Sequence, residues 1–347
     1  MAARIVTTIS RADKIKIAVL VLLVAAVPAY VVLPMVRDQL EAFFSIRRAQ
    51  VFGVVLLAIL LEAFPFVLLG SIVSGAIEVL VSPEGLMRLV PRRPAARLAL
   101  APLLGLVFPV CECGVVPVVR RLIRKGLPAD MAVVYLLAGP IINPIVIAST
   151  VLAFSRMRPV WVMPAARVGV GVLVAVAAGA VLVRLDRGRP VLGAAAPAPP
   201  ARDLRGGVLG AIVHHAAHDF LLLGGFLLLG SIIAAAAQAF VPRTILVSVG
   251  RTPLVSSAGM MALAFVLNLC SEADAFVAAS FVQFSFASKL AFLALGPMLD
   301  VKLVAMYLGA FPRRLLVVVL AVAPAMVLGL SELVGLAHDG LFAGAAP

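Results

Sequence analysis

The chain has 347 residues, of which 63% are hydrophobic and only 13% are charged, with a formal net charge of +13 at pH 7. An average soluble domain carries about 25% charged residues, and a soluble fold of this length cannot bury so large an apolar fraction. Composition therefore excludes a soluble globular protein and predicts an integral membrane protein. The basic residues lie between the apolar runs and not on one basic face, so they predict membrane topology and no nucleic-acid partner.

Apolar runs long enough to cross a bilayer, about 20 residues each, occur nine times in the sequence. They are rich in Ala, Val and Leu and unbroken, whereas the strands of a membrane β-barrel alternate with a period of two. We therefore expect an all-α polytopic membrane protein. The predicted segments are 15–36, 50–80, 98–118, 127–153, 160–184, 207–240, 254–279, 285–310 and 313–337.

The first segment follows four basic residues and is longer than the core of a signal peptide. We expect residues 1–48 to form a retained N-terminal transmembrane helix and a loop. Residues 186–206 are rich in Pro, Ala and Arg, a composition typical of an extended, solvated linker.

The sequences on the two sides of this linker resemble each other. LLGSIVSG at 68–75 corresponds to LLGSIIAA at 228–235, an offset of 160 residues. Cys111 corresponds to Cys270, and Asn143 after Gly-Pro corresponds to Asp300 after Gly-Pro, at offsets of 159 and 157. We predict two homologous four-segment repeats, residues 49–185 and 207–347, an organisation typical of secondary transporters.

The distribution of basic residues bears on how the repeats are oriented. If all nine segments cross, Lys and Arg are divided almost evenly between the two sides. If segments 98–118 and 254–279 enter and leave on one side, the basic residues concentrate on the side of the N-terminus, as the positive-inside rule favours. Each unit then has three crossings, which predicts inverted repeats with re-entrant or broken cysteine-bearing segments.

The first cysteine-bearing segment reads FPVCECGVVPVVRR from Phe108 to Arg121, and its counterpart reads NLCSEADAF from Asn268 to Phe276. Proline and glycine weaken the helix in the first. Open backbone at membrane depth is tolerated only where protein or a water-lined cavity satisfies its polar groups. We therefore expect the solute site at these two segments.

Three acids, Glu112, Glu272 and Asp274, lie in these segments. A carboxylate at the bilayer centre costs on the order of 3 kcal/mol. One interpretation is that the acids carry protons or bind cations. The alternative is that they lie at the membrane edge or pair with basic residues such as Arg167 or Lys302.

Three cysteines cannot form a fully paired disulfide framework. Cys111 and Cys113 are close enough for two sulfurs to face one soft ion, and thiolates select soft metals and metalloids. A repeat axis could bring Cys270 to the same place. The alternative is that these cysteines are small buried hydrophobic residues.

Two further patterns each have two interpretations. Asn143 and Asp300 follow helix-breaking Gly-Pro pairs, so each could bind solute or cap a half-helix. His214 and His218 share a helical face beside Asp219 and could hold a metal ion, although a solvated helix start fits the same pattern. Glu62 lies next to Phe64-Pro65, where a structural role at a kink is one interpretation.

In these motifs the chain resembles the YraQ/ArsP-type predicted permeases, a family that includes organoarsenical efflux permeases. The similarity runs from residue 50 to residue 310 and rests on PVCECGVVPVVRRLIRKG with AGPIINP, and CSEADAFVAASF with LAFLALGPMLDVK. The resemblance implies a multi-pass permease of the cell (inner) membrane that acts as a proton-linked or other secondary exporter. For organoarsenical members it implies cysteine thiols that meet trivalent arsenic, here Cys111 and Cys113, with Cys270 as a further candidate.

We therefore expect a permease, not an enzyme, that moves a small solute and needs no cofactor. The expected site residues are Cys111, Glu112, Cys113, Asn143, Cys270, Glu272, Asp274 and Asp300. Expected partners are the lipid bilayer and a second membrane subunit or further copies of the chain. The alternatives are an intramembrane thiol redox enzyme, with Cys111 or Cys113 as the reactive group, and a non-transporting membrane subunit.

Overall fold

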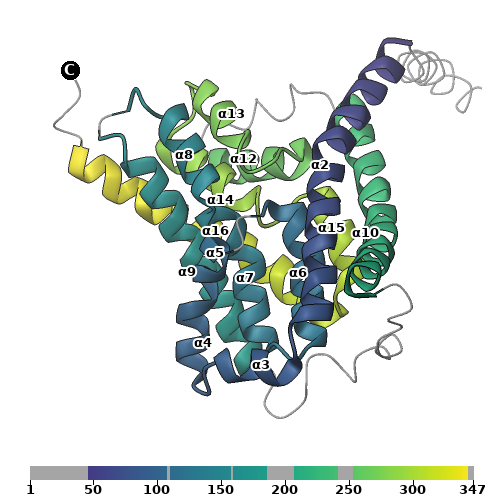
Figure 1. Ribbon diagram of the computed structural model, residues 1–347. Helices are drawn as coiled ribbons and strands as arrows, with labels where there is room; N and C mark the ends of the chain where they lie inside the picture. Colours follow the sequence, from purple (N-terminus) through teal and green to yellow (C-terminus); the bar gives the residue numbers. More distant parts are fainter. Residues whose placement is uncertain (1–45, 108–109, 158, 186–206, 241–252, 343–347) are drawn as a thin grey trace, which may run out of the picture. The chain divides into compact units, whose positions relative to one another are not determined.

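The computed structural model describes residues 46–107, 110–157, 159–185, 207–240 and 253–342, and the regular structure in these ranges is helical throughout (Figure 1). The predicted all-α fold is confirmed for this part of the chain. The predicted helix at 15–36 and the linker at 186–206 lie outside the described residues. The chain divides into two compact units, residues 1–52 and 53–347, and of the first only the start of one helix is described.

Four helices are long and apolar enough to cross a bilayer. They are α2 (Ile46–Leu80), α9 (Val162–Leu185), α10 (Gly207–Phe240) and α16 (Arg313–Phe342). A fifth span forms if α7 (Ala129–Ile142) and α8 (Pro144–Ala153), which meet at an angle of 42°, are counted together. The chain is a multi-pass membrane protein.

The other predicted segments are interrupted. Segment 98–118 contains α4 (Pro94–Leu100), the 3₁₀ turn η1 (Ala101–Leu103), α5 (Leu104–Val107) and the start of α6 (Glu112–Arg124). Segment 254–279 contains α12 (Pro253–Leu267) and α13 (Asp274–Ser280). Segment 285–310 contains α14 (Phe286–Leu295) and α15 (Val301–Ala310), and a short helix, α3 (Pro83–Leu89), follows α2.

The first interrupted segment begins and ends at the same end of α7. Near its start, Arg97 donates a hydrogen bond of 2.8 Å from Nε to Asp130, which lies in the first turn of α7. At its other end, α6 stops at Arg124, and residues 125–128 lead directly into α7. The chain therefore runs away from this end in α4 and α5 and returns to it in α6.

The second interrupted segment has the same form. Near the start of α12, the hydroxyls of Ser256 and Ser257 lie 3.0 and 3.1 Å from the hydroxyl of Ser288 in the first turn of α14. Helix α13 ends at Ser280, and residues 281–285 connect it to α14. Because α13 packs against α8, this segment lies at the opposite end of the α7–α8 pair from α3 and α4 (Figure 1).

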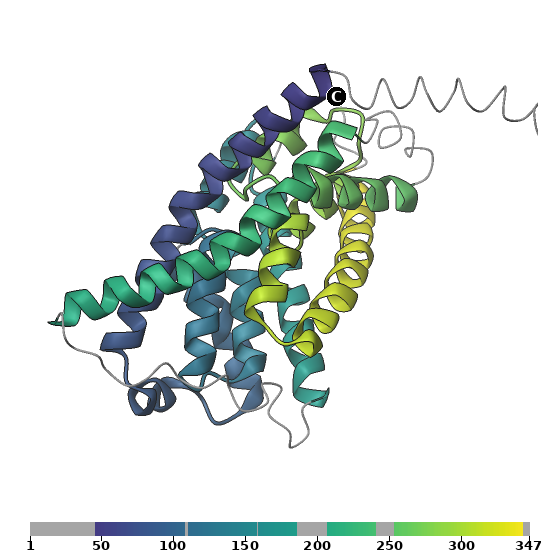
Figure 2. The same cartoon turned by 90° about the vertical axis from the view of Figure 1, so that its right-hand side faces the viewer.

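The shorter helices form the centre of the second unit. Helix α7 is almost wholly buried, and α6 packs against α15 just as α13 packs against α8. The long helices surround them, with α9 against α7 and α16, and α10 along α15 (Figure 2). The exposed side chains of α2 and α10 include many large hydrophobic residues, as expected for surfaces that face lipid.

Glycines of the repeated LLGS motif allow these helices to approach closely. A methyl group at Gly70 in α2 would collide with the carbonyl group of Gly114 in α6. The corresponding glycine in α10, Gly230, would place its methyl group 2.7 Å from the Cα atom of Lys302 in α15. The motif therefore positions each long helix against a short helix that begins near the middle of the unit.

Candidate functional site

Three short helices begin at residues that the sequence analysis selected. Cys111 is the N-cap of α6, with extended backbone at φ −71° and ψ 174°. Asn143 caps α8 by accepting a hydrogen bond of 3.0 Å from the backbone N–H of Ile145. Asp300 caps α15 by accepting one of 2.6 Å from the backbone N–H of Leu303. The capping interpretation of Asn143 and Asp300 is thus confirmed.

The helix break in the first AGPIINP motif lies later than its Gly-Pro pair. Pro140 remains inside α7, and the chain bends at Asn143. The residue before a proline disfavours the α conformation, so Asn143, which precedes Pro144, is where the helix ends. In the second half, Gly296 directly follows the end of α14, so there the Gly-Pro pair does mark the break.

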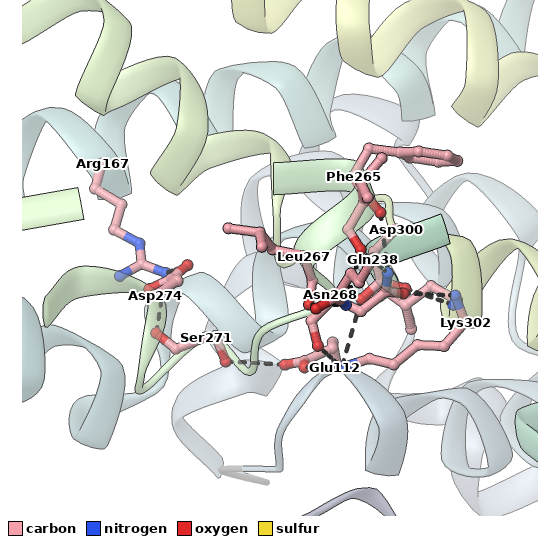
Figure 3. A network of polar contacts seen from close by, with 12 residues as sticks. Glu112, Arg167, Gln238, Phe265, Leu267, Asn268, Ser271, Asp274, Asp300 and Lys302 are labelled. Carbon is pink, nitrogen blue, oxygen red and sulfur yellow. Dashed lines mark hydrogen bonds and ion pairs between the residues drawn. The ribbon is translucent and has the colours of Figure 1, made fainter. Parts of the chain in front are cut away.

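Lys302 belongs to a buried polar network, at the right-hand end of the residues drawn in Figure 3. Its ammonium group is 3.4 Å from a carboxylate oxygen of Glu112 and 3.4 Å from one of Asp300. It also donates a hydrogen bond of 3.2 Å to the backbone carbonyl of Asn268. Because Glu112 precedes the central linker and the other three residues follow it, this cation ties the two halves of the chain together.

Asn268 shapes the break in the second cysteine-bearing segment. Its backbone has a φ of 52°, a left-handed conformation that asparagine tolerates better than other non-glycine residues, and α12 ends one residue earlier. Its side chain donates to the carbonyl groups of Phe265 and Val266 and accepts a hydrogen bond of 2.9 Å from the N–H of Lys302. These bonds satisfy the end of α12 and hold it against the start of α15.

The network continues through Ser271 to Arg167 (Figure 3). The hydroxyl of Ser271 donates a hydrogen bond of 2.9 Å to the second carboxylate oxygen of Glu112. Arg167 in α9 donates to the carbonyl of Ser271 and forms an ion pair of 2.7 Å with Asp274. Its other terminal nitrogen donates to the hydroxyl of Thr150 at 2.8 Å.

Two of the three acids in the cysteine-bearing segments therefore have basic partners, and these are Lys302 for Glu112 and Arg167 for Asp274. The interpretation that these acids pair with Arg or Lys is confirmed. All four side chains are at most 3% exposed, so they do not lie at an exposed edge of the unit. Buried ion pairs add little net stability but are costly to break, so the arrangement holds the two halves in one register.

The thiol groups occupy two places. The side chains of Cys111 and Cys113 interact with each other and are almost fully buried. The thiol of Cys270 is a neighbour of the carboxylates of Glu62 and Glu272. The thiols of Cys111 and Cys113 are thus adjacent as expected. That the thiol of Cys270 joins them at one site stays a prediction.

Several buried oxygen atoms lack a hydrogen-bond partner among the described residues. They include one carboxylate oxygen each of Glu272, Asp274 and Asp300, and the hydroxyls of Ser71 and Ser231. The two serines belong to the corresponding LLGS motifs and are fully buried. A buried oxygen without a hydrogen bond is costly, so these atoms are candidates for contact with a solute, an ion or a proton.

The geometry does not support the predicted metal site at His214, His218 and Asp219. Asp219 is buried and accepts hydrogen bonds from Arg121 and from Ser74, at 2.5 and 2.6 Å, whereas His214 and His218 are exposed. No three His, Cys, Asp or Glu side chains in the described ranges are arranged to hold a metal ion. Asp219 instead ties α10 to α6 through a buried ion pair with Arg121 and to α2 through the hydrogen bond from Ser74.

Two residues of the network, Asn268 and Ser271, had no role assigned from the sequence. Ser271 is offset from Glu112 by 159 residues, the offset that relates Cys111 to Cys270, so the repeat pattern contained a signal for their contact. The signal for Arg167 is that it is the one basic residue between Val162 and Val183 in a strongly apolar helix. An isolated arginine in such a helix requires a buried acidic partner.

Comparison with known proteins agrees with this membrane architecture. Residues 49–336 match a family described as predicted permeases, the ArsP type. The chain is 38% identical to the UPF0718 protein YcgR of Bacillus subtilis over 286 residues, which cover 81% of this chain and 95% of that protein. It is 37% identical to a putative two-component membrane permease complex subunit of Streptococcus mutans over 265 residues, covering 75% and 87%. No solved structure matches the chain.

Proposed function

Because the chain belongs to the ArsP-type family of predicted permeases, we propose that it is a secondary, proton-linked exporter of a small thiophilic solute. The solute passes through a site between the two halves of the chain. The observation that carries this proposal is the buried network in which Glu112 from the first half contacts Lys302 and Ser271 from the second. A network that joins two halves at helix breaks is where a transporter binds its solute.

The proposal includes an inverted duplication of residues 49–185 and 207–347. Corresponding contacts support it, because the pair Arg97–Asp130 has its counterpart in Ser256–Ser288, at offsets of 159 and 158 residues. The reciprocal packing of α6 on α15 and of α13 on α8 also supports it. In this arrangement α4–α6 and α12–α13 enter the membrane from opposite faces as re-entrant segments.

The thiols and the acids have separate tasks in this proposal. Cys111 and Cys113, whose side chains are in contact at the start of α6, bind a thiophilic metalloid or metal species. Glu112, Glu272, Asp274 and Asp300 compensate charge or carry the coupling proton, and Asn143 and Asp300 line the pathway from the caps of their half-helices. The sequence contains no G-x-x-x-x-G-K-[ST] nucleotide-binding loop, which favours a secondary mechanism in the cell (inner) membrane.

A second candidate function is that of one subunit in a larger permease. The relative in Streptococcus mutans carries the name of a two-component membrane permease complex subunit. On this proposal a second membrane subunit completes the pathway, and the chain alone does not transport. Reconstitution of the purified chain without any partner separates the two candidates, since solute flux through it alone supports the first.

The proposed function is tested by a growth screen followed by a flux measurement. A sensitised host that expresses the chain is challenged with trivalent arsenicals, antimonials and soft metal ions, and we expect tolerance to at least one of them. Cys111→Ser removes this tolerance, whereas Met87→Leu, which removes an exposed sulfur from α3, leaves it unchanged. In vesicles, flux of the same solute follows an imposed pH gradient.

Two results would overturn this assignment. Tolerance and flux that are indifferent to both Cys111→Ser and Glu272→Gln would show that the proposed residues do not form the site. Turnover of a thiol substrate by the purified chain without solute flux would support the alternative of an intramembrane thiol enzyme.

A further inference from the structure

The buried network carries more acidic than basic groups. Five carboxylates interact within it, those of Glu62, Glu112, Glu272, Asp274 and Asp300. Among the described residues, the basic groups that they face are Arg167 and Lys302. If every group is ionised, three negative charges have no partner in a region of low dielectric constant. Protons or a cation from outside the protein must therefore balance them.

The position of Lys302 indicates where that positive charge is accommodated. Its ammonium nitrogen has three oxygen neighbours, one each from Glu112, Asp300 and the backbone of Asn268, at 3.4, 3.4 and 3.2 Å. The oxygen of Asp300 in this set makes no hydrogen bond, and the Asp300 side chain is 1% exposed. This buried and incompletely satisfied oxygen thus points at a place where a cation already sits.

Sulfur and further carboxylates lie beside this place. The Cys270 thiol is a neighbour of Glu62 and Glu272, and both Glu62 and the Cys113 thiol interact electrostatically with Lys302. Carboxylate and thiol groups together suit a borderline or soft metal cation, whereas an excess of carboxylates repels an oxyanion.

We propose that this cluster binds a metal cation with affinity for both carboxylate and thiol ligands. The ammonium group of Lys302 occupies the position of that cation when no metal ion is bound, and it competes with the metal ion for the same carboxylates. The inference rests on the proposed permease function and specifies the charge of its solute. In the present state the described residues contain no group of three side chains arranged to hold a metal ion. The site forms when the ammonium group withdraws from Glu112 and Asp300, which also releases the two halves from each other.

The test is a calorimetric titration of the purified full-length protein in detergent with CdCl₂ at constant ionic strength. We expect the wild-type protein to bind Cd²⁺ and Lys302→Met to bind it at least about tenfold more tightly, because a like charge at contact distance has been removed. Lys125→Met is the matched control, since Lys125 donates to backbone carbonyl groups at the end of α2, outside the cluster, and its loss leaves the affinity unchanged.

Absence of Cd²⁺ binding by the wild-type protein, or equal affinity of the wild type and Lys302→Met, would overturn the inference. If Lys302→Met does not fold, the Cd²⁺ affinity of Glu272→Gln tests the proposal instead, because this change leaves the ion pairs of Lys302 and Arg167 in place. It must weaken Cd²⁺ binding by about tenfold, since one carboxylate ligand is lost, and unchanged affinity contradicts the proposal. Binding of neutral arsenous acid in a parallel titration without Cd²⁺ binding would refute the cation but leave the permease intact.

Discussion

Glu112→Gln is expected to lower solute flux by at least about 30-fold. The carboxylate is 1% exposed, lies 3.4 Å from the ammonium group of Lys302 and accepts a hydrogen bond from Ser271. Loss of one partner of a buried hydrogen-bonded charge pair costs about 2 to 5 kcal/mol, and the lower value corresponds to this factor. The measurement is flux into vesicles of the solute that the growth screen identifies.

The matched control for this prediction is Glu84→Gln. Glu84 lies on the exposed helix α3, so its loss removes one negative charge without touching the network. Flux through Glu84→Gln should equal that of the wild type. Wild-type flux through Glu112→Gln, with the protein inserted in equal amount, would mean that the contact between the halves has no part in transport.

Arg167→Met and Asp274→Asn are each expected to lower the midpoint of thermal unfolding in detergent by on the order of 10 °C. Both side chains are at most 3% exposed, and their ion pair of 2.7 Å joins α9 to α13. Each single change leaves an unpaired charge or an unsatisfied donor in the interior. The double variant Arg167→Met with Asp274→Leu removes both and should restore most of the midpoint.

Transport by this double variant separates a structural role from a functional one. If Asp274 compensates charge or carries a proton, the double variant is stable but does not transport, which is the result we expect. The control is the double variant Arg97→Met with Asp130→Leu, which removes an ion pair at the end of α7 and should transport normally. Normal transport by the Arg167 and Asp274 double variant would assign this pair to folding alone.

The helical class and the position of the long helices follow from hydropathy, because a run of about 20 apolar residues has few alternatives to a membrane helix. Segments 160–184 and 207–240 agree with α9 and α10 to within two residues. Segments 98–118, 254–279 and 285–310 are equally apolar, yet each is interrupted near its middle. Hydropathy reports how apolar the surroundings of a residue are, and much of the surroundings of these segments is apolar protein.

The location of the breaks was only partly predictable. A proline such as Pro140 loses one hydrogen bond and is tolerated within α7, whereas Asn143 ends the helix because Pro144 follows it. The break after Leu267 depends on the left-handed backbone of Asn268, whose side chain is held by contacts with α15. Contacts between segments far apart in the sequence cannot be derived from local propensity.

For the candidate site, the sequence identified most of the acids and thiols but not how they are distributed. Repeat correspondence identified Cys270 as the counterpart of Cys111, yet the thiol of Cys270 faces carboxylates. Asp219 follows His218 in the sequence and suggested a metal site, but its side chain points to Arg121 on α6. His218 is 63% exposed, although its Nδ1 lies 3.7 Å from a carboxylate oxygen of Asp219, so this short polar motif does not by itself define a buried site.

In the proposed arrangement the two cysteine-bearing segments enter the membrane from opposite faces and meet inside it. Labelling of single cysteines with a membrane-impermeant thiol reagent, in a background without the three native cysteines, tests it directly. Cysteines introduced at Arg92 and Arg124, which flank the first segment, should react from one face of oriented vesicles, and a cysteine at the exposed Gln283 from the other. Reaction of positions 92 and 124 from opposite faces would show that the first segment crosses the membrane and is not re-entrant.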